Sequence, residues 1–228
     1  MMKLLLAPLF ALLSVAAQAQ EAPPGAGTAV SPAGDYVHSE REMIAGLRLN
    51  PDGSFEYALT VGSLDESAKG RWQAEGNRIR LTSDPRPVPP TITATRIDAD
   101  PGKPFSIRVL TPRGVDMPGV DMLVEFDSGD PLDTYTPGVP WTVPADENRS
   151  PRFVTFSMPS YRLRSERLPL DPKPGTTAIF SLTPNDFGVA DFTGAEVEFQ
   201  AGKLILHRPE GSMDFRRVEP REKDGEPE

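Results

Sequence analysis

Hydrophobic and polar residues alternate with a period of two along most of the chain between residues 35 and 218. The clearest runs are 43–49 and 54–61. In each of them every second residue is apolar, so an extended chain places the apolar side chains on one face. Asn50-Pro51-Asp52-Gly53 separates them. Proline presets the backbone for a turn, aspartate tolerates the next position, and glycine accepts a positive φ. The pattern predicts a β-hairpin.

A second hairpin is predicted around Glu75-Gly76-Asn77. Gly70, Trp72 and Ala74 precede this turn on one face, and Ile79 and Leu81 follow it. Further strands are expected within 105–109, 120–126, 153–158, 161–170 and 176–183. No segment predicts a helix, because the chain has 26 prolines and a proline inside a helix costs about 3 kcal/mol. The sequence therefore predicts an all-β protein.

Two stretches near the end of the chain resemble the two early hairpins. Residues 198–206 repeat the aromatic-Gln-Ala stem, Gly turn and return strand of 71–81, and 209–215 match the turn and strand of 51–57. One interpretation is chance similarity between β-hairpins. The other is that both ends of the chain build one sheet, because a sheet limited to the first two hairpins would leave open edges.

The second interpretation gives a specific domain organisation. Residues 35–83 plus 187–218 form a small meander or barrel. Residues 84–91, which include four prolines, form a stiff linker. Residues 92–186 form an inserted β-sandwich-like module.

The ends of the chain have their own signals. Residues 1–19 combine Lys3, an apolar stretch too short to span a bilayer, and Ala17-Gln18-Ala19, which is typical of a cleavable signal peptide. We expect cleavage near Ala19 and a periplasmic or secreted protein without a transmembrane segment. A flexible leader at 20–34 and a disordered tail at 219–228 are also expected.

Composition excludes several kinds of chemistry. The chain has no cysteine, so it has no disulfide, thiolate metal site or cysteine nucleophile. A net charge of −9 argues against nucleic acid as a partner. Its two histidines, His38 and His207, are too few to indicate a zinc site, and Gly-x-Ser-x-Gly is absent. We predict no metal, cofactor or catalytic residue.

Four positive charges share the polar face of the second hairpin: Lys69, Arg71, Arg78 and Arg80. Cross-strand pairing gathers them on one surface, which would suit an acidic partner, an anionic glycan or a lipid headgroup. The alternative is that they keep the sheet soluble or pair with Glu56 and neighbouring acids.

Three aromatic residues are further candidates for ligand contact. Tyr57 and Trp72 lie in the apolar phase of their strands, so they are placed in the barrel core or near its mouth. Trp141 follows Pro137-Gly138-Val139-Pro140, either as an exposed loop aromatic or as a cap on the second core.

Two segments resemble known families. The run from Gly34 through Asp52-Gly53-Ser54-Phe55, Gly70-Arg71-Trp72 and Ile79-Arg80-Leu81 resembles the small lipocalin-like meanders of bacterial envelope proteins. Residues 105–126 resemble the start of carboxypeptidase-regulatory-like, transthyretin-like sandwiches, with Gly-Val-Asp-Met occurring twice. The first resemblance implies a barrel, and the second implies an accessory sandwich without catalytic residues.

These observations favour binding over catalysis. We expect an exported, soluble, non-enzymatic envelope or periplasmic protein that binds an envelope component or a small ligand. One alternative is a lipocalin-like carrier of a small apolar molecule inside the barrel. Another is a hydrolase that uses a pair of carboxylates, although the sequence does not identify the pair.

Overall fold

The computed structural model describes residues 31–200, 202–208 and 211–219. Within these residues the fold is all-β, as predicted, and the only helical element is the 3-10 turn η1 (Pro159–Tyr161). The predicted signal peptide lies outside the described residues, as do most of the leader and nearly all of the tail.

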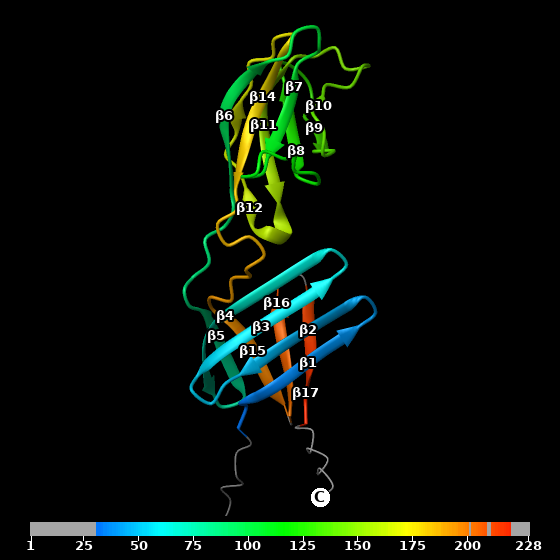
Figure 1. Ribbon diagram of the computed structural model, residues 1–228. Coiled ribbons are helices and arrows are strands. Elements are labelled where there is room, and N and C mark those ends of the chain that lie inside the picture. The colour runs from blue at the N-terminus through cyan, green and yellow to red at the C-terminus, as the bar shows by residue number, and fades with distance from the viewer. Residues whose placement is uncertain (1–30, 201, 209–210, 220–228) are drawn as a thin grey trace, which may run out of the picture. The chain divides into compact units, whose positions relative to one another are not determined.

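A closed eight-stranded barrel is built from both ends of the chain (Figure 1). Its strands follow the order β1-β17-β16-β15-β5-β4-β3-β2 around the barrel. Their bounds are β1 (Gly34–Glu40), β2 (Met43–Leu49), β3 (Ser54–Val61), β4 (Leu64–Glu75), β5 (Arg78–Ser83), β15 (Ala195–Gln200), β16 (Lys203–Arg208) and β17 (Gly211–Arg217). The C-terminal strands thus cover both edges that the first five strands would leave open, since β15 pairs with β5 and β17 pairs with β1.

The turn between β2 and β3 has the predicted chemistry. Gly53 has a φ of 81°, which glycine adopts without a steric penalty. The Asp52 carboxylate accepts hydrogen bonds from the backbone and hydroxyl of Ser54, and these bonds lower the pKa of Asp52. The turn sets the register in which Leu49 faces Phe55.

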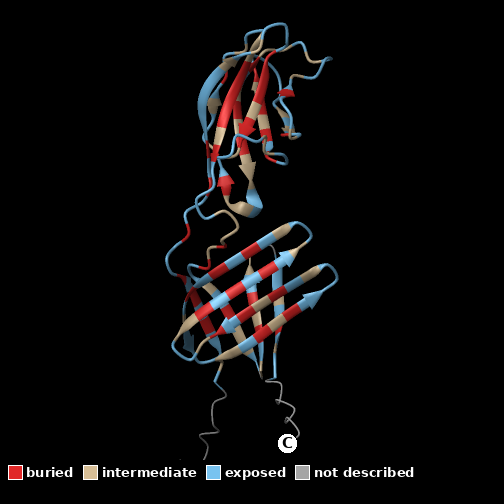
Figure 2. Ribbon diagram, viewed as in Figure 1, coloured by how far each residue is buried: buried red, intermediate tan, exposed pale blue. Residues whose placement is uncertain are grey.

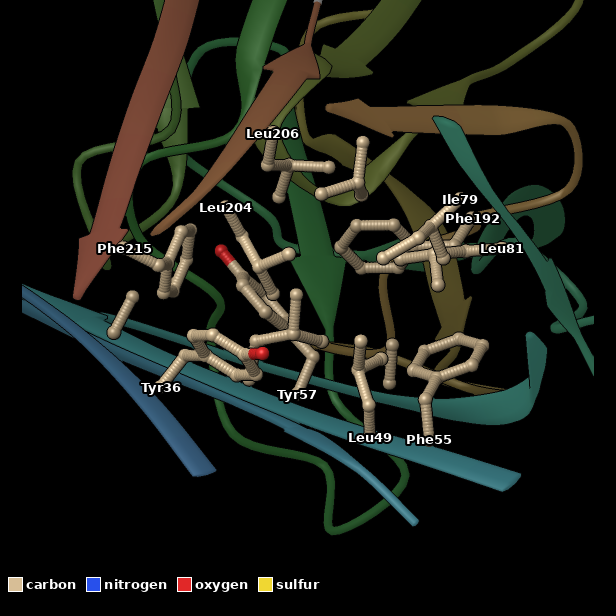
Figure 3. Packing of buried hydrophobic residues seen from close by; sticks show 14 of the residues in the cluster. Tyr36, Leu49, Phe55, Tyr57, Ile79, Leu81, Phe192, Leu204, Leu206 and Phe215 are labelled. Atoms are coloured by element: carbon tan, nitrogen blue, oxygen red, sulfur yellow. The ribbon is translucent and has the colours of Figure 1, made fainter. Parts of the chain in front are cut away.

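Alternating burial along the strands produces the barrel core, seen as buried positions interleaved with exposed ones in Figure 2. The side chains directed inward include Tyr36, Phe55, Tyr57, Leu81, Leu204 and Phe215, which converge in Figure 3. Phe192, which precedes β15, joins them with its ring 4.8 Å from that of Tyr57 and 5.8 Å from that of Phe55. Hydrophobic side chains therefore occupy the interior of the barrel.

The seam between the first and last strands is short. β1 and β17 share two register pairs, whereas β1 and β2 share seven. Arg217 reinforces the seam by donating hydrogen bonds to the Ala33 carbonyl (2.6 Å) and the Tyr36 hydroxyl (3.0 Å), and that hydroxyl donates to the Pro32 carbonyl. Residues 32–34, expected at the end of a flexible leader, are consequently attached to the barrel.

The strands between the two parts of the barrel form two further sheets around a second core. One sheet has the order β10-β7-β14-β6, and the other has the order β12-β11-β8-β9, with β13 also paired to β11. Their bounds are β6 (Thr91–Ala99), β7 (Ser106–Leu110), β8 (Asp121–Phe126), β9 (Leu132–Tyr135), β10 (Trp141–Thr142), β11 (Pro151–Met158), β12 (Leu163–Arg164), β13 (Leu168–Pro169) and β14 (Thr176–Thr183). The inserted β-sandwich-like module is confirmed by this arrangement.

Two connecting segments run between barrel strands and sandwich strands, and they are hydrogen-bonded to each other. The Val88 amide donates to the Asp186 carboxylate, and the Asp186 amide donates to the Val88 carbonyl. Asn185 donates to the Pro89 carbonyl. The proline-rich segment is therefore tied to the returning chain.

Arg149 ties two loops of the sandwich together, and this contact makes a pH-dependent prediction. Its guanidinium donates to both Glu147 carboxylate oxygens and to the carbonyls of Ser128 and Asp130. The hydrogen bonds from Arg149 lower the pKa of Glu147 to about 2. A depressed carboxyl pKa contributes stability above its ordinary value and loses it as the pH falls toward the folded value.

We expect Glu147→Gln to lower the midpoint of thermal unfolding at neutral pH. The difference from the unmodified protein should shrink between about pH 4.5 and about pH 2, because the carboxyl group then becomes protonated. Calorimetric unfolding scans across this range measure the difference. A difference that stays constant with pH would contradict the assignment.

Candidate ligand-binding pocket

A pocket of about 270 Å³ opens at one end of the barrel. It lies where β1 ends and β2 begins, where β3 ends and β4 begins, and beside the junction of β16 and β17. Five apolar side chains line it: Met43, Leu59, Val61, Leu64 and Met213. We call this space the mouth pocket. Its volume lies just below the usual range of small-molecule sites, about 300–1,000 Å³.

A buried ion pair forms part of the lining. Glu66, on β4, and Arg208, on β16, lie 2.7 Å apart between Oε2 and Nη1, and their side chains are 7% and 18% exposed. Arg208 Nη1 also donates to the Tyr57 hydroxyl at 3.1 Å. The pair stabilises a charge that would be costly to bury alone, and it positions polar atoms beside the apolar lining.

His38 is the other buried polar group of the mouth pocket, with 6% of its surface exposed. Its Nδ1 lies 2.9 Å from the carbonyl oxygen of Asp214, on β17. Its Nε2 is buried without a hydrogen-bond partner and lies 3.6 Å from an oxygen of Glu40. His38 thus spans the short seam between β1 and β17 and leaves one ring nitrogen available.

The four predicted basic residues lie together on the outer surface of the barrel, and the register places acidic residues among them. Lys69 is opposite Glu56, and Arg78 is opposite Glu75 and Glu198. Arg80 is opposite Glu196, at 3.9 Å between Nη2 and Oε1. Arg71 donates to the Asp52 carbonyl. The surface is therefore mixed in charge, and whether it contacts an acidic partner stays a prediction.

The three aromatic candidates are not brought together. Tyr57 is buried in the barrel core and contacts Arg208. Trp72 packs against the same core but donates from Nε1 to the Asn50 carbonyl, at the end of the barrel opposite the mouth pocket. Trp141 is 7% exposed and belongs to the core of the sandwich. Of the three, only Tyr57 reaches the polar network beside the mouth pocket.

The two histidines also differ in burial and in their contacts. His38 is buried, whereas His207 is half-exposed and contacts Ser212 and Glu198 on the outer surface. Across residues 31–200, 202–208 and 211–219, no three side chains of types that bind metals are grouped as a metal site. The same residues include no helix with the length and apolar character needed to cross a membrane.

The sequence does contain a signal for the polar residues of the mouth pocket, namely their positions in the strands. Glu66 lies in the inward phase of β4 together with Ala68, and Arg208 lies in the inward phase of β16 together with Leu206. His38 follows Tyr36 in the inward phase of β1. A charged or polar residue at an inward position marks either a buried pair or a site.

Comparison of the chain with models of protein families, with curated protein sequences and with solved structures gave no match. The class of the protein is therefore given by its fold. It is an all-β protein with a closed eight-stranded barrel, and a two-sheet module is inserted in the sequence between barrel strands β5 and β15. An eight-stranded closed barrel is compatible with a lipocalin-like architecture.

Proposed function

We propose that this protein is an exported, non-enzymatic binding protein of the bacterial envelope or periplasm whose barrel mouth takes a small, largely apolar ligand. The mouth pocket carries the proposal, because it combines an apolar lining with a few buried polar groups, which is typical of ligand sites. Export is supported by the signal-peptide pattern of residues 1–19.

The ligand is bound at the mouth rather than deep inside the barrel. Phe192, Tyr57 and Phe55 pack against one another in the interior, so the available apolar space lies toward the rim. This narrows the carrier hypothesis to a small molecule held between the ends of the strands.

Binding of a neutral fluorescent probe, N-phenyl-1-naphthylamine, tests the proposal. We expect saturable binding, and we expect Met43→Trp to weaken it at least about tenfold because the indole takes the space of the ligand. Ile44→Trp is the matched control, since Ile44 is the next residue of β2 and is 55% exposed on the outer face. Absence of saturable binding, or equal weakening by both variants, would contradict the proposed function.

A further inference from the structure

The hydrogen-bonding state of His38 follows from its surroundings. The Asp214 carbonyl can only accept, so the ring nitrogen facing it, Nδ1, carries the hydrogen. In the neutral ring Nε2 is then a bare acceptor. It is buried, has no hydrogen-bond partner in the protein, and belongs to a residue that lines the mouth pocket.

The Nε2 atom of His38 also lies close to a charged group on the same strand, the carboxylate of Glu40. Glu40 places a carboxylate oxygen 3.6 Å from Nε2, so in the neutral ring two acceptors face each other, and the contact is an ion pair only when the ring is protonated. A buried acceptor without a partner costs about 1–3 kcal/mol. A donor supplied from the pocket would satisfy Nε2 and would be placed beside the Glu40 oxygen.

The other polar groups of the pocket restrict the charge of the ligand. Arg208 already donates to Glu66 and to the Tyr57 hydroxyl. Arg208 therefore compensates the charge of Glu66, and the carboxylate of Glu40, which also lines the pocket beside Nε2, disfavours an anionic head group there. The apolar lining of Met43, Leu59 and Met213 suits an aliphatic or aromatic body.

We propose that His38 Nε2 is the specificity-determining acceptor of the mouth pocket, and that the ligand is a neutral amphiphile whose hydroxyl group donates to it. This inference rests on the proposed function, since it names the ligand class of the same pocket. The hydroxyl head is held at the β1–β17 seam, and the apolar body lies against the ends of β2, β3 and β4.

Displacement of N-phenyl-1-naphthylamine by 1-decanol and by its donor-free counterpart 1-methoxynonane tests the proposal. We expect the preference for the alcohol over the ether to fall about tenfold from the unmodified protein to His38→Phe, which is the loss of one hydrogen bond. The comparison across both ligands and both proteins removes the intrinsic difference in hydrophobicity between the ligands. Phenylalanine retains a ring against Phe215, whose centroid lies 5.7 Å from that of His38.

His207→Phe is the matched control, because His207 lies on the outer surface and is not part of the mouth pocket. It should leave the preference unchanged. A preference that survives in His38→Phe overturns the inference while leaving the proposed function intact. Equal displacement of the probe from the unmodified protein by the alcohol and the ether also overturns the inference and leaves the proposed function intact. A water molecule retained at Nε2 would produce this result. Failure of the probe to bind in the first place removes the proposed function and the inference together.

A second measurement needs no variant of His38. The chain has two histidines, so nitrogen-15 NMR of the imidazole rings resolves His38 once His207→Phe has assigned the other. We expect Nε2 to be unprotonated in the ligand-free protein and to shift on addition of decanol but not of 1-methoxynonane. A hydrogen on Nε2 in the ligand-free protein, or equal shifts with both ligands, would overturn the inference.

Discussion

Gly70→Ala should destabilise the protein by about 3 kcal/mol or more, a larger loss than a typical single substitution causes. A Cβ atom at this position would lie 2.0 Å from the Thr82 carbonyl oxygen, and 2.8 Å from both the Asp84 amide nitrogen and the Phe55 ring. Two of these contacts are with backbone, which cannot rotate away. Urea-induced unfolding measures the loss as a shift of the midpoint at unchanged slope.

Gly46→Ala is the matched control for this substitution. Gly46 also lies within a barrel strand, but the nearest atom to its added Cβ is the Tyr36 carbonyl oxygen at 4.0 Å. We expect no loss of stability, because alanine is accommodated and lowers the entropy of the unfolded chain. Equal losses in both variants would show that close approach of β4 to its neighbours is not the cause.

Arg208→Met should destabilise the protein by about 3–5 kcal/mol, because it leaves the buried Glu66 carboxylate without its guanidinium partner. Methionine keeps much of the apolar stem, so the loss reports mainly on the charge. Unfolding in urea at neutral pH measures it.

The double variant Glu66→Leu with Arg208→Met is the control. Removing both charges is often neutral or stabilising when apolar residues of similar volume replace them. We therefore expect the double variant to be more stable than Arg208→Met alone. If the double variant is less stable than Arg208→Met, and its loss equals the sum of the losses of the two single variants, the two side chains are not coupled. The buried pair is then not what positions the lining of the pocket.

The alternation of apolar residues predicted the barrel strands well, because the period of two follows directly from the geometry of an extended chain. Asn50-Pro51-Asp52-Gly53 predicted its turn for an equally local reason: Gly53 must adopt a positive φ. The resemblance between 198–206 and 71–81 pointed to one shared sheet, and β15 does pair with β5.

The candidate site was harder to predict, since a periodic pattern gives the face of a residue but not its height along the barrel. Tyr57 and Trp72 share the inward face, yet Tyr57 contacts Arg208 and Trp72 contacts the turn at Asn50. The cross-strand neighbour of Lys69 likewise depends on register, and that of Arg80, Glu196, lies on a strand more than a hundred residues away. The pairing of Glu66 with Arg208 is equally distant in sequence.

The central claim is that the mouth pocket binds the ligand, and methionine methyl groups test it most directly. Met43 and Met213 line the pocket, whereas Met117, Met122 and Met158 belong to or pack against the core of the sandwich. In a protein labelled with carbon-13 at the methionine methyl groups, titration with 1-decanol should shift the resonances of Met43 and Met213 in a saturable manner and leave those three in place. Saturable shifts confined to the sandwich methionines, or saturable binding with Met43 and Met213 unmoved, would contradict the account.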